Sequence, residues 1–160
     1  TRGFYYPPER ATHVDYLKGY SDARMLSGIV LSGGNAAWRG KELPDGVLGG
    51  ILTANNIARL DLSGTEMVVL SACQSGQGKA TSEGLYGLQR AFKKAGVGTM
   101  VMALWSVSDK VTTEFMTTFY EQLASKKCQW NKRKAFETTK SIIREKYPDP
   151  FYWAAFVMLD

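Results

Sequence analysis

The sequence predicts an α/β layer sandwich, a parallel or mostly parallel β-sheet covered by helices. Several continuous apolar segments lack polar alternation, which is typical of strands buried on both faces. Between them lie stripes in which apolar residues recur every three or four positions, as in amphipathic helices. The chain has 160 residues, of which 44% are hydrophobic and 12% aromatic, so it can bury a core of its own. We therefore expect a single domain over 1–160.

Four segments have the strand pattern. The clearest is 66–72 (EMVVLSA), which has a β-branched apolar core without polar alternation. The other three expected strands are 27–32, 99–105 and 151–159. Gly33 and Gly34 predict a turn after the first strand, and 35–50, which contains Gly, Pro and Asp, predicts an irregular surface loop.

Four segments have helix signals. Thr53 predicts the N-cap of a short helix through Leu60, because its hydroxyl can accept from the amides of the first turn. A second helix is expected over 82–95, ended by Gly96. Two more are expected over 110–124 and 132–147, the last stopped by Pro148. The apolar side of 110–124 consists of Val111, Phe115, Met116, Phe119, Tyr120 and Leu123.

Composition excludes several functional classes. The net charge of +5 arises mainly from 126–146, which we interpret as a solvated helix face because no aromatic or glycine-rich nucleic-acid motif accompanies it. One histidine and two distant cysteines make a metal site improbable, and we expect no cofactor. The sequence contains no apolar segment long enough to span a membrane and no secretory signal. Reduced cysteines and a cytoplasmic location are therefore expected.

Cys73 is the candidate nucleophile. It directly follows the strand expected over 66–72, and functional groups gather at the carboxyl ends of strands in open α/β sheets. The loop 74–78 (QSGQG) can bring backbone amides close to a reacting carbonyl. Position alone also allows an ordinary small residue at a strand end. The glycines of a hydrolase elbow are absent, since Ser71 and Ser75 occupy their places, and no Rossmann or Walker motif is present.

Five segments stand out in order along the chain: 50–62 (GILTANNIARLDL), 69–76 (VLSACQSG), 82–92 (SEGLYGLQRAF), 103–109 (ALWSVSD) and 152–157 (YWAAFV). Together they resemble the CHAT domain, a bacterial caspase-like module related to separases and usually fused to tetratricopeptide repeats. Two departures are Gly49, where an aspartate is usual, and Ser82, which precedes the Glu-Gly pair of the family helix. The resemblance implies a three-layer α/β/α fold with helices on both faces, of which this chain is the C-terminal portion. It also places one or two strands before Thr1, so we expect a neighbouring segment or chain to complete the sheet.

The resemblance implies a cysteine endopeptidase with a His–Cys dyad, but the histidine is missing. The family histidine lies in a Thr-His-Gly motif at the end of an early strand, and here the corresponding residues are Thr1, Arg2 and Gly3. A guanidinium stays charged and cannot act as a base, although its charge would favour the thiolate. The chain is then a naturally silent relative, an engineered inactive form, or a piece whose histidine precedes Thr1. His13, in a polar segment, is the weaker substitute.

The resemblance also implies the remaining roles. Cys73 would attack a protein or peptide substrate, and the backbone N–H groups of Gly3 and Cys73 would form the oxyanion hole. Asp109 would line a pocket that favours Lys or Arg, with Trp105 as a pocket wall. Asp109 at the first turn of a helix and Trp105 in the core are the competing structural roles. An interaction module without catalysis and a small-molecule hydrolase remain alternative functions.

Overall fold

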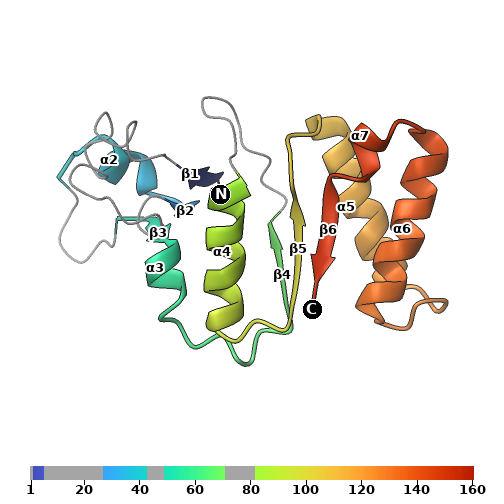
Figure 1. Cartoon of the computed structure of the whole chain (residues 1–160), viewed down its shortest axis with the longest axis horizontal. Coiled ribbons are helices and arrows are strands. Elements are labelled where there is room, and N and C mark those ends of the chain that lie inside the picture. The colour runs from blue at the N-terminus through green and yellow to red at the C-terminus, as the bar shows by residue number, and fades with distance from the viewer. Residues whose placement is uncertain (1, 6–26, 43–48, 71–81) are drawn as a thin grey trace. The chain divides into compact units, whose positions relative to one another are not determined.

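The computed structural model describes residues 2–5, 27–42, 49–70 and 82–160. The chain divides into two compact units (Figure 1). The first comprises Thr1–Met67 with Gln74–Gly98, and the second comprises Val68–Cys73 with Thr99–Asp160. Within the described ranges, no helix is long and apolar enough to cross a membrane.

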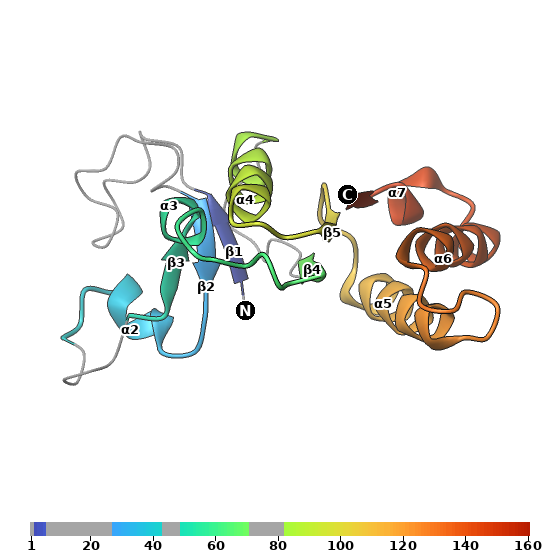
Figure 2. The ribbon, with the colours of Figure 1, turned by 90° about the horizontal axis from the view of Figure 1, so that it is seen from below.

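The first unit contains a three-stranded sheet in the order β1-β2-β3. Its strands are β1 (Arg2–Tyr5), β2 (Ser27–Val30) and β3 (Ile51–Thr53). Both pairings are antiparallel. Two helices, α3 (Ala54–Ile57) and α4 (Ser82–Lys94), lie side by side and pack on β2 (Figures 1 and 2).

Local signals in the sequence correctly located the start of α3 and the stop after α4. Thr53 caps α3 through a capping box: its hydroxyl accepts from the Asn56 amide at 3.2 Å, and the Asn56 side chain accepts from the Thr53 amide at 3.1 Å. The helix is shorter than expected and ends before Leu60. Gly96, with φ of +100°, follows α4. The Gly96 amide donates to the Lys93 carbonyl and the Val97 amide to the Phe92 carbonyl, both at 3.1 Å, which is a Schellman motif.

The expectation of an irregular loop over 35–50 is wrong at its start. A short helix, α2 (Gly34–Trp38), begins there. Gly33, at φ of +83°, turns the chain after β2, and Gly34 approaches its neighbours so closely that an added Cβ would lie 2.5 Å from Val30 and 2.8 Å from the Gly50 carbonyl oxygen. The two alanines of α2 favour a helical turn, a signal that the Gly and Pro content of the whole segment outweighed in the sequence analysis.

The second unit has a three-stranded sheet in the order β4-β5-β6. Its strands are β4 (Met67–Leu70), β5 (Thr99–Ala103) and β6 (Phe156–Leu159). Figure 1 shows β4 and β5 running in the same direction, whereas β5 and β6 are antiparallel, with Ala103 opposite Phe156. The carboxyl ends of β4 and β5 and the start of β6 therefore lie at one edge of this sheet.

Two long helices build the core of the second unit, and both views show them side by side (Figures 1 and 2). They are α5 (Asp109–Ala124) and α6 (Lys132–Lys146). Phe115 on α5 stacks on Phe156 at 3.9 Å between ring centroids and meets the edge of Phe136 on α6 at 5.7 Å. The predicted apolar side of α5 is buried except for Tyr120, which is 48% exposed. The prediction for Tyr120 was wrong because that residue lies at the border of the stripe.

Polar contacts join the N-terminal part of α5 to the C-terminal end of α6. The Glu114 carboxylate accepts from the Lys146 ammonium and, at 2.9 Å, from the Tyr147 hydroxyl. These hydrogen bonds, chiefly the one from Lys146, hold the pKa of Glu114 below its ordinary value. The same contact raises the pKa of Lys146. The predicted solvated face of α6 is thus tied to α5 at its C-terminal end.

The strand expected over 151–159 begins later than predicted. A short helix, α7 (Pro150–Trp153), precedes β6. Its N-cap is Asp149, whose carboxylate accepts from the Phe151 amide at 2.9 Å, and Pro150 occupies the first helical position. Proline is favoured there because its missing N–H has no helical partner to lose. The apolar run concealed this start signal.

The structure establishes a mixed α/β chain, but the expected single, mostly parallel sheet is wrong for the pairings whose register is known. The β1–β2, β2–β3 and β5–β6 pairs are all antiparallel, and the strands form two sheets. Continuous apolar runs report burial on both faces of a strand, and they carry no information about the direction of its neighbour.

Candidate functional site

The edge of the second sheet where β4 and β5 end is where the sequence placed the chemistry. From Leu70, the last residue of β4, the chain continues through Ser71 and Ala72 to Cys73. Cys73 lies outside the described residues, so its predicted role as nucleophile stays a prediction. The same holds for the loop 74–78 and for His13.

Trp105 lies just beyond the end of β5. The Leu104 amide continues the pairing by donating to the Ala155 carbonyl at 2.9 Å, and the indole N–H of Trp105 donates to the Phe151 carbonyl at 2.9 Å. The Trp105 ring lies 6.4 Å from the Phe151 ring and is 37% exposed. Trp105 is therefore not a core residue. Its hydrogen bond holds one apolar ring face at the sheet edge, which is compatible with the predicted pocket wall.

Asp109 begins α5 a few residues further on. Ser108 is the N-cap, and its hydroxyl accepts from the Val111 amide at 3.4 Å. Asp109 is exposed and lies in the first turn, where the positive end of the helix dipole favours a carboxylate. The competing structural role of Asp109 is thus real. An exposed carboxylate held by a capped helix is also suitably fixed to bind a cationic side chain, so both roles remain open.

Two apolar residues at this edge were missed by the sequence reasoning. Leu104 is 41% exposed and Phe151 is 50% exposed. The rings of Phe151 and Trp105 lie next to each other and form an apolar surface at the sheet edge, which we call the edge cluster. Leu104 and Phe151 had been assigned to strand interiors. The signal that could have found Phe151 is Asp149 followed by Pro150, because this pair starts a helix and ends the strand interpretation.

Arg2 and Gly3 belong to the first unit. They lie in β1, with Arg2 opposite Val30 and Gly3 opposite Ile29 on β2. The resemblance placed the dyad position at the end of a strand, whereas Arg2 is the first residue of β1. The strand extends over the aromatic residues after Gly3 because β2 offers them a partner. The halves of the predicted site thus lie in different compact units.

Neither a metal site nor a reactive second cysteine emerges from the described residues. No group of three or more His, Cys, Asp or Glu side chains within them is arranged to hold a metal ion. Cys128, after α5, is free and buried. Burial makes its thiol poorly accessible, so Cys73 remains the candidate nucleophile of the sequence analysis.

Comparisons with known proteins identify relatives. The family model described as "CHAT domain" matches residues 11–160. Tetratricopeptide repeat protein 28 of Mus musculus is 33% identical and that of Homo sapiens 29% identical, each over 110 residues. Each match covers 68% of this chain and 4% of the relative, so the chain spans a small part of these relatives. Both relatives are mammalian, so they do not support the bacterial origin implied by the resemblance. No solved structure matches the chain.

Proposed function

The chain belongs to the CHAT domain family, and we propose that it carries the scaffold of a caspase-like cysteine endopeptidase with Cys73 as nucleophile. The observation that carries the proposal is that β4 and β5 end at the same edge of the second sheet. The segment leading to Cys73 leaves β4 where β5 ends, and Trp105 and Asp109 follow β5. We further propose the complete three-layer arrangement of caspase-like proteins, with the missing strands supplied from outside the described residues.

In the proposed reaction the sulfur of Cys73 attacks the carbonyl carbon of a peptide bond. A C–S bond forms, and the carbonyl oxygen takes up the electron pair while the backbone N–H groups of Gly3 and Cys73 stabilise its charge. The C–N bond then breaks, the amine leaves with the proton of the thiol, and water hydrolyses the thioester. Asp109 would bind a Lys or Arg side chain of the substrate before the cut, with the edge cluster beside it.

The proton transfer is the step that this chain performs poorly. A general base and acid contributes a factor of about 10²–10⁴ to such reactions, and the Arg2 guanidinium cannot supply it. We therefore propose that the chain is inactive or very slow with Arg2 in place. Its cationic charge would still favour the thiolate, so the nucleophile could be formed without the turnover being fast.

Restoring the base tests the proposal. Arg2→His in the complete protein should raise kcat/KM for peptides with Lys or Arg before the cut by about 10²–10⁴-fold. Arg2→Gln, which removes the charge and adds no base, should not do so. Cys73→Ala in the Arg2→His background should abolish cleavage. If the Arg2→His protein cleaves no peptide and is not labelled by thiol-directed peptide inhibitors, the endopeptidase proposal is wrong.

A non-catalytic interaction module is the second candidate, and Arg2 at the dyad position favours it. On this alternative, Cys73→Ala leaves the cellular function of the complete protein unchanged while the fold is preserved. Loss of that function in a folded Cys73→Ala protein would exclude it. Labelling of Cys73 in the unchanged protein by a peptide inhibitor would favour the catalytic scaffold.

Regulation by a neighbouring region is part of the proposal. The two relatives are named for tetratricopeptide repeats, and we propose that such repeats, as a neighbouring segment or a partner, control this domain. A reducing, cytoplasmic location is also proposed.

A further inference from the structure

The connection between α5 and α6 presents an unusually exposed tryptophan. Trp130 is 70% exposed, the highest value among the exposed large apolar side chains of the described residues. Gln129 and Trp130 both have positive φ, at +50° and +61°. Residues other than glycine rarely adopt this left-handed conformation, which costs about 1 kcal/mol for each. The backbone of this connection is therefore strained at two residues, the second of which exposes its indole ring to solvent.

Backbone hydrogen bonds hold this loop in place. The Gln129 amide donates to the Ser125 carbonyl at 2.9 Å, and the Trp130 amide donates to the Leu123 carbonyl at 3.1 Å. Cys128, directly before Gln129, is buried, and its amide donates to the Ser125 carbonyl at 3.2 Å. The exposed indole is therefore held on a fixed support, so little conformational entropy would be lost on binding a partner.

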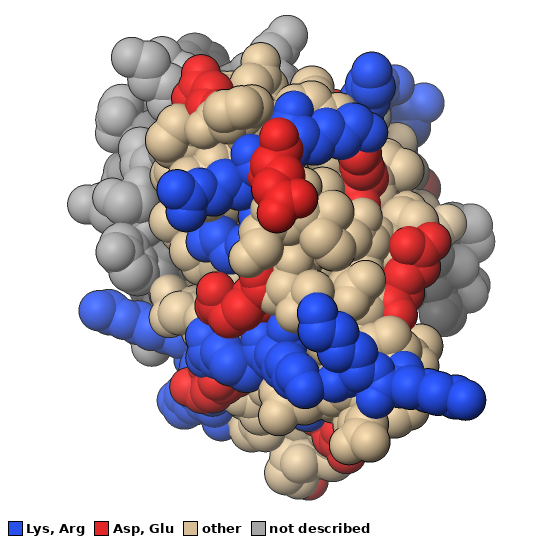
Figure 3. Space-filling view, turned by 90° about the vertical axis from the view of Figure 1, so that its right-hand side faces the viewer, with Lys and Arg blue, Asp and Glu red and all other residues tan. Residues whose placement is uncertain are grey.

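Cations surround Trp130 on both sides in the sequence. The segment 126–134 (KKCQWNKRK) contains five Lys and Arg residues and no acidic residue. We call this segment, which spans the connection and the first residues of α6, the basic loop. Figure 3 shows Lys and Arg side chains gathered in a band across the lower part of the face formed by this end of the molecule. Like charges this close repel one another, so an anionic partner would relieve the repulsion.

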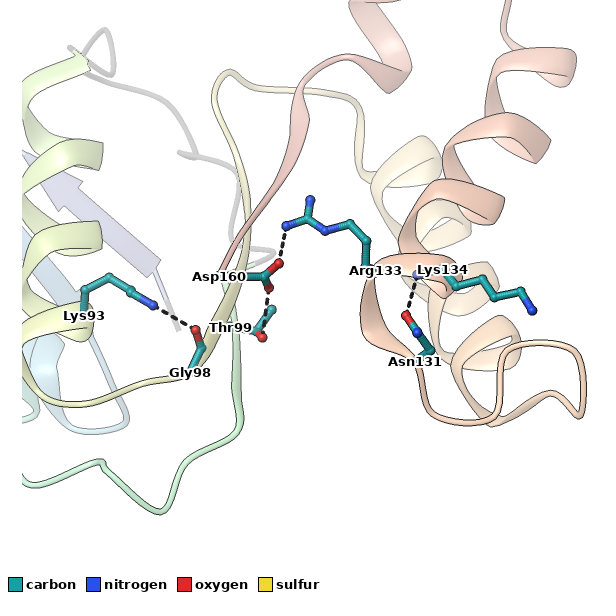
Figure 4. Close-up of polar contacts among 7 residues, drawn as sticks. All are labelled: Lys93, Gly98, Thr99, Asn131, Arg133, Lys134 and Asp160. Atoms are coloured by element: carbon teal, nitrogen blue, oxygen red, sulfur yellow. Dashed lines mark hydrogen bonds and ion pairs between the residues drawn. The ribbon is translucent and has the colours of Figure 1, made fainter.

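Two contacts of the basic loop involve its charged groups. Arg133 forms an exposed ion pair with Asp160, which also accepts from the Thr99 hydroxyl at 3.1 Å (Figure 4). The Lys134 ammonium donates to the Lys127 carbonyl at 2.6 Å, a contact that satisfies a donor without neutralising the charge. The Asp160 carboxylate thus offsets the charge of Arg133, whereas the contact of Lys134 leaves its charge in place.

We propose that the basic loop is a docking surface for an acidic polypeptide segment of another protein or region, with Trp130 receiving an apolar side chain of that segment. Charge complementarity selects the occupant, and tryptophan is among the residues that contribute most to protein interfaces. Single-stranded nucleic acid is disfavoured because such sites stack successive bases on several aromatic rings, and Trp130 is the single aromatic residue in 126–134. The proposal does not depend on catalysis at Cys73.

The test measures how tightly the complete protein binds two fluorescent peptides. One consists of repeated Asp-Glu-Leu-Asp-Glu units, and the other carries Ser in place of each Leu. Trp130→Ala should weaken binding of the leucine peptide about tenfold and affect the serine peptide less, and Trp130→Phe should restore much of it. Phe151→Ala, which removes another exposed ring, should change binding less than about twofold.

A charge-matched pair of variants separates the basic loop from the overall charge. Lys126→Glu with Lys127→Glu should weaken binding at least tenfold, whereas Arg90→Glu with Lys94→Glu, on the exposed side of α4, should have a much smaller effect. Thermal melts confirm that each variant is folded. Equal losses in both pairs, an unchanged affinity of Trp130→Ala, or tighter binding of an oligouridine than of the leucine peptide would each overturn the proposal.

Discussion

Replacing Phe115 by alanine tests the packing of the second unit, which supports the sheet edge. Phe115 is fully buried, stacked on Phe156 of β6 and in edge contact with Phe136 of α6. It therefore joins two helices and the strand that begins at the candidate site. Without its ring, α5 would leave a cavity at the point where all three elements meet.

The size of the effect follows from these contacts. Deleting a buried phenylalanine ring costs about 3–5 kcal/mol, which includes the cavity, and each aromatic pair adds about 0.5–1.5 kcal/mol beyond its buried area. We expect Phe115→Ala to lower the free energy of unfolding by about 4–5 kcal/mol. Because a domain is stable by about 5–15 kcal/mol, this loss consumes much of the margin.

Urea unfolding, followed by tryptophan fluorescence, measures the effect. With a slope of about 2 kcal/mol per molar urea, the midpoint should fall by about 2 M. Tyr120→Ala on the same helix is the matched control, because Tyr120 is 48% exposed, and it should cost about 1 kcal/mol or less. If Phe115→Ala costs no more than Tyr120→Ala, the aromatic cluster is not the core of this unit and the reasoning fails.

Two further predictions test the helix ends. Gly96→Ala should lower the free energy of unfolding by about 1–3 kcal/mol, because φ is +100° and the new Cβ would lie 2.9 Å from the Ser63 Cα. The control Gly64→Ala, with open space around the new Cβ, should stay within about 0.5 kcal/mol. Equal urea midpoints of the two variants would contradict this prediction. Glu114→Gln should lower the melting temperature between about pH 5 and pH 10. The difference should shrink as acid protonates Glu114 below its lowered pKa and as alkali deprotonates Lys146 above its raised pKa; a difference that persists at pH 2 would contradict the assignment.

Local chemistry made much of the secondary structure predictable. The Thr53 cap, the stop at Gly96 and the apolar side of α5 each depend on a few neighbouring residues, so the sequence alone determined them. The five ordered segments likewise identified the family from the sequence alone. The expectation that Arg2 stands at the dyad position also comes from the sequence alone, and the family match over 11–160 does not include it.

Strand direction, partner choice and exposure were decided only by the tertiary structure. An apolar run reads the same in a parallel and in an antiparallel sheet, so the antiparallel pairing of β5 with β6 had no sequence signal. Leu104 and Phe151 read as strand residues, yet both lie exposed beside Trp105, since burial depends on where β5 ends and α7 turns. The left-handed backbone that places Trp130 in solvent is likewise set by the surrounding contacts, because no local preference of Gln129 or Trp130 favours that conformation.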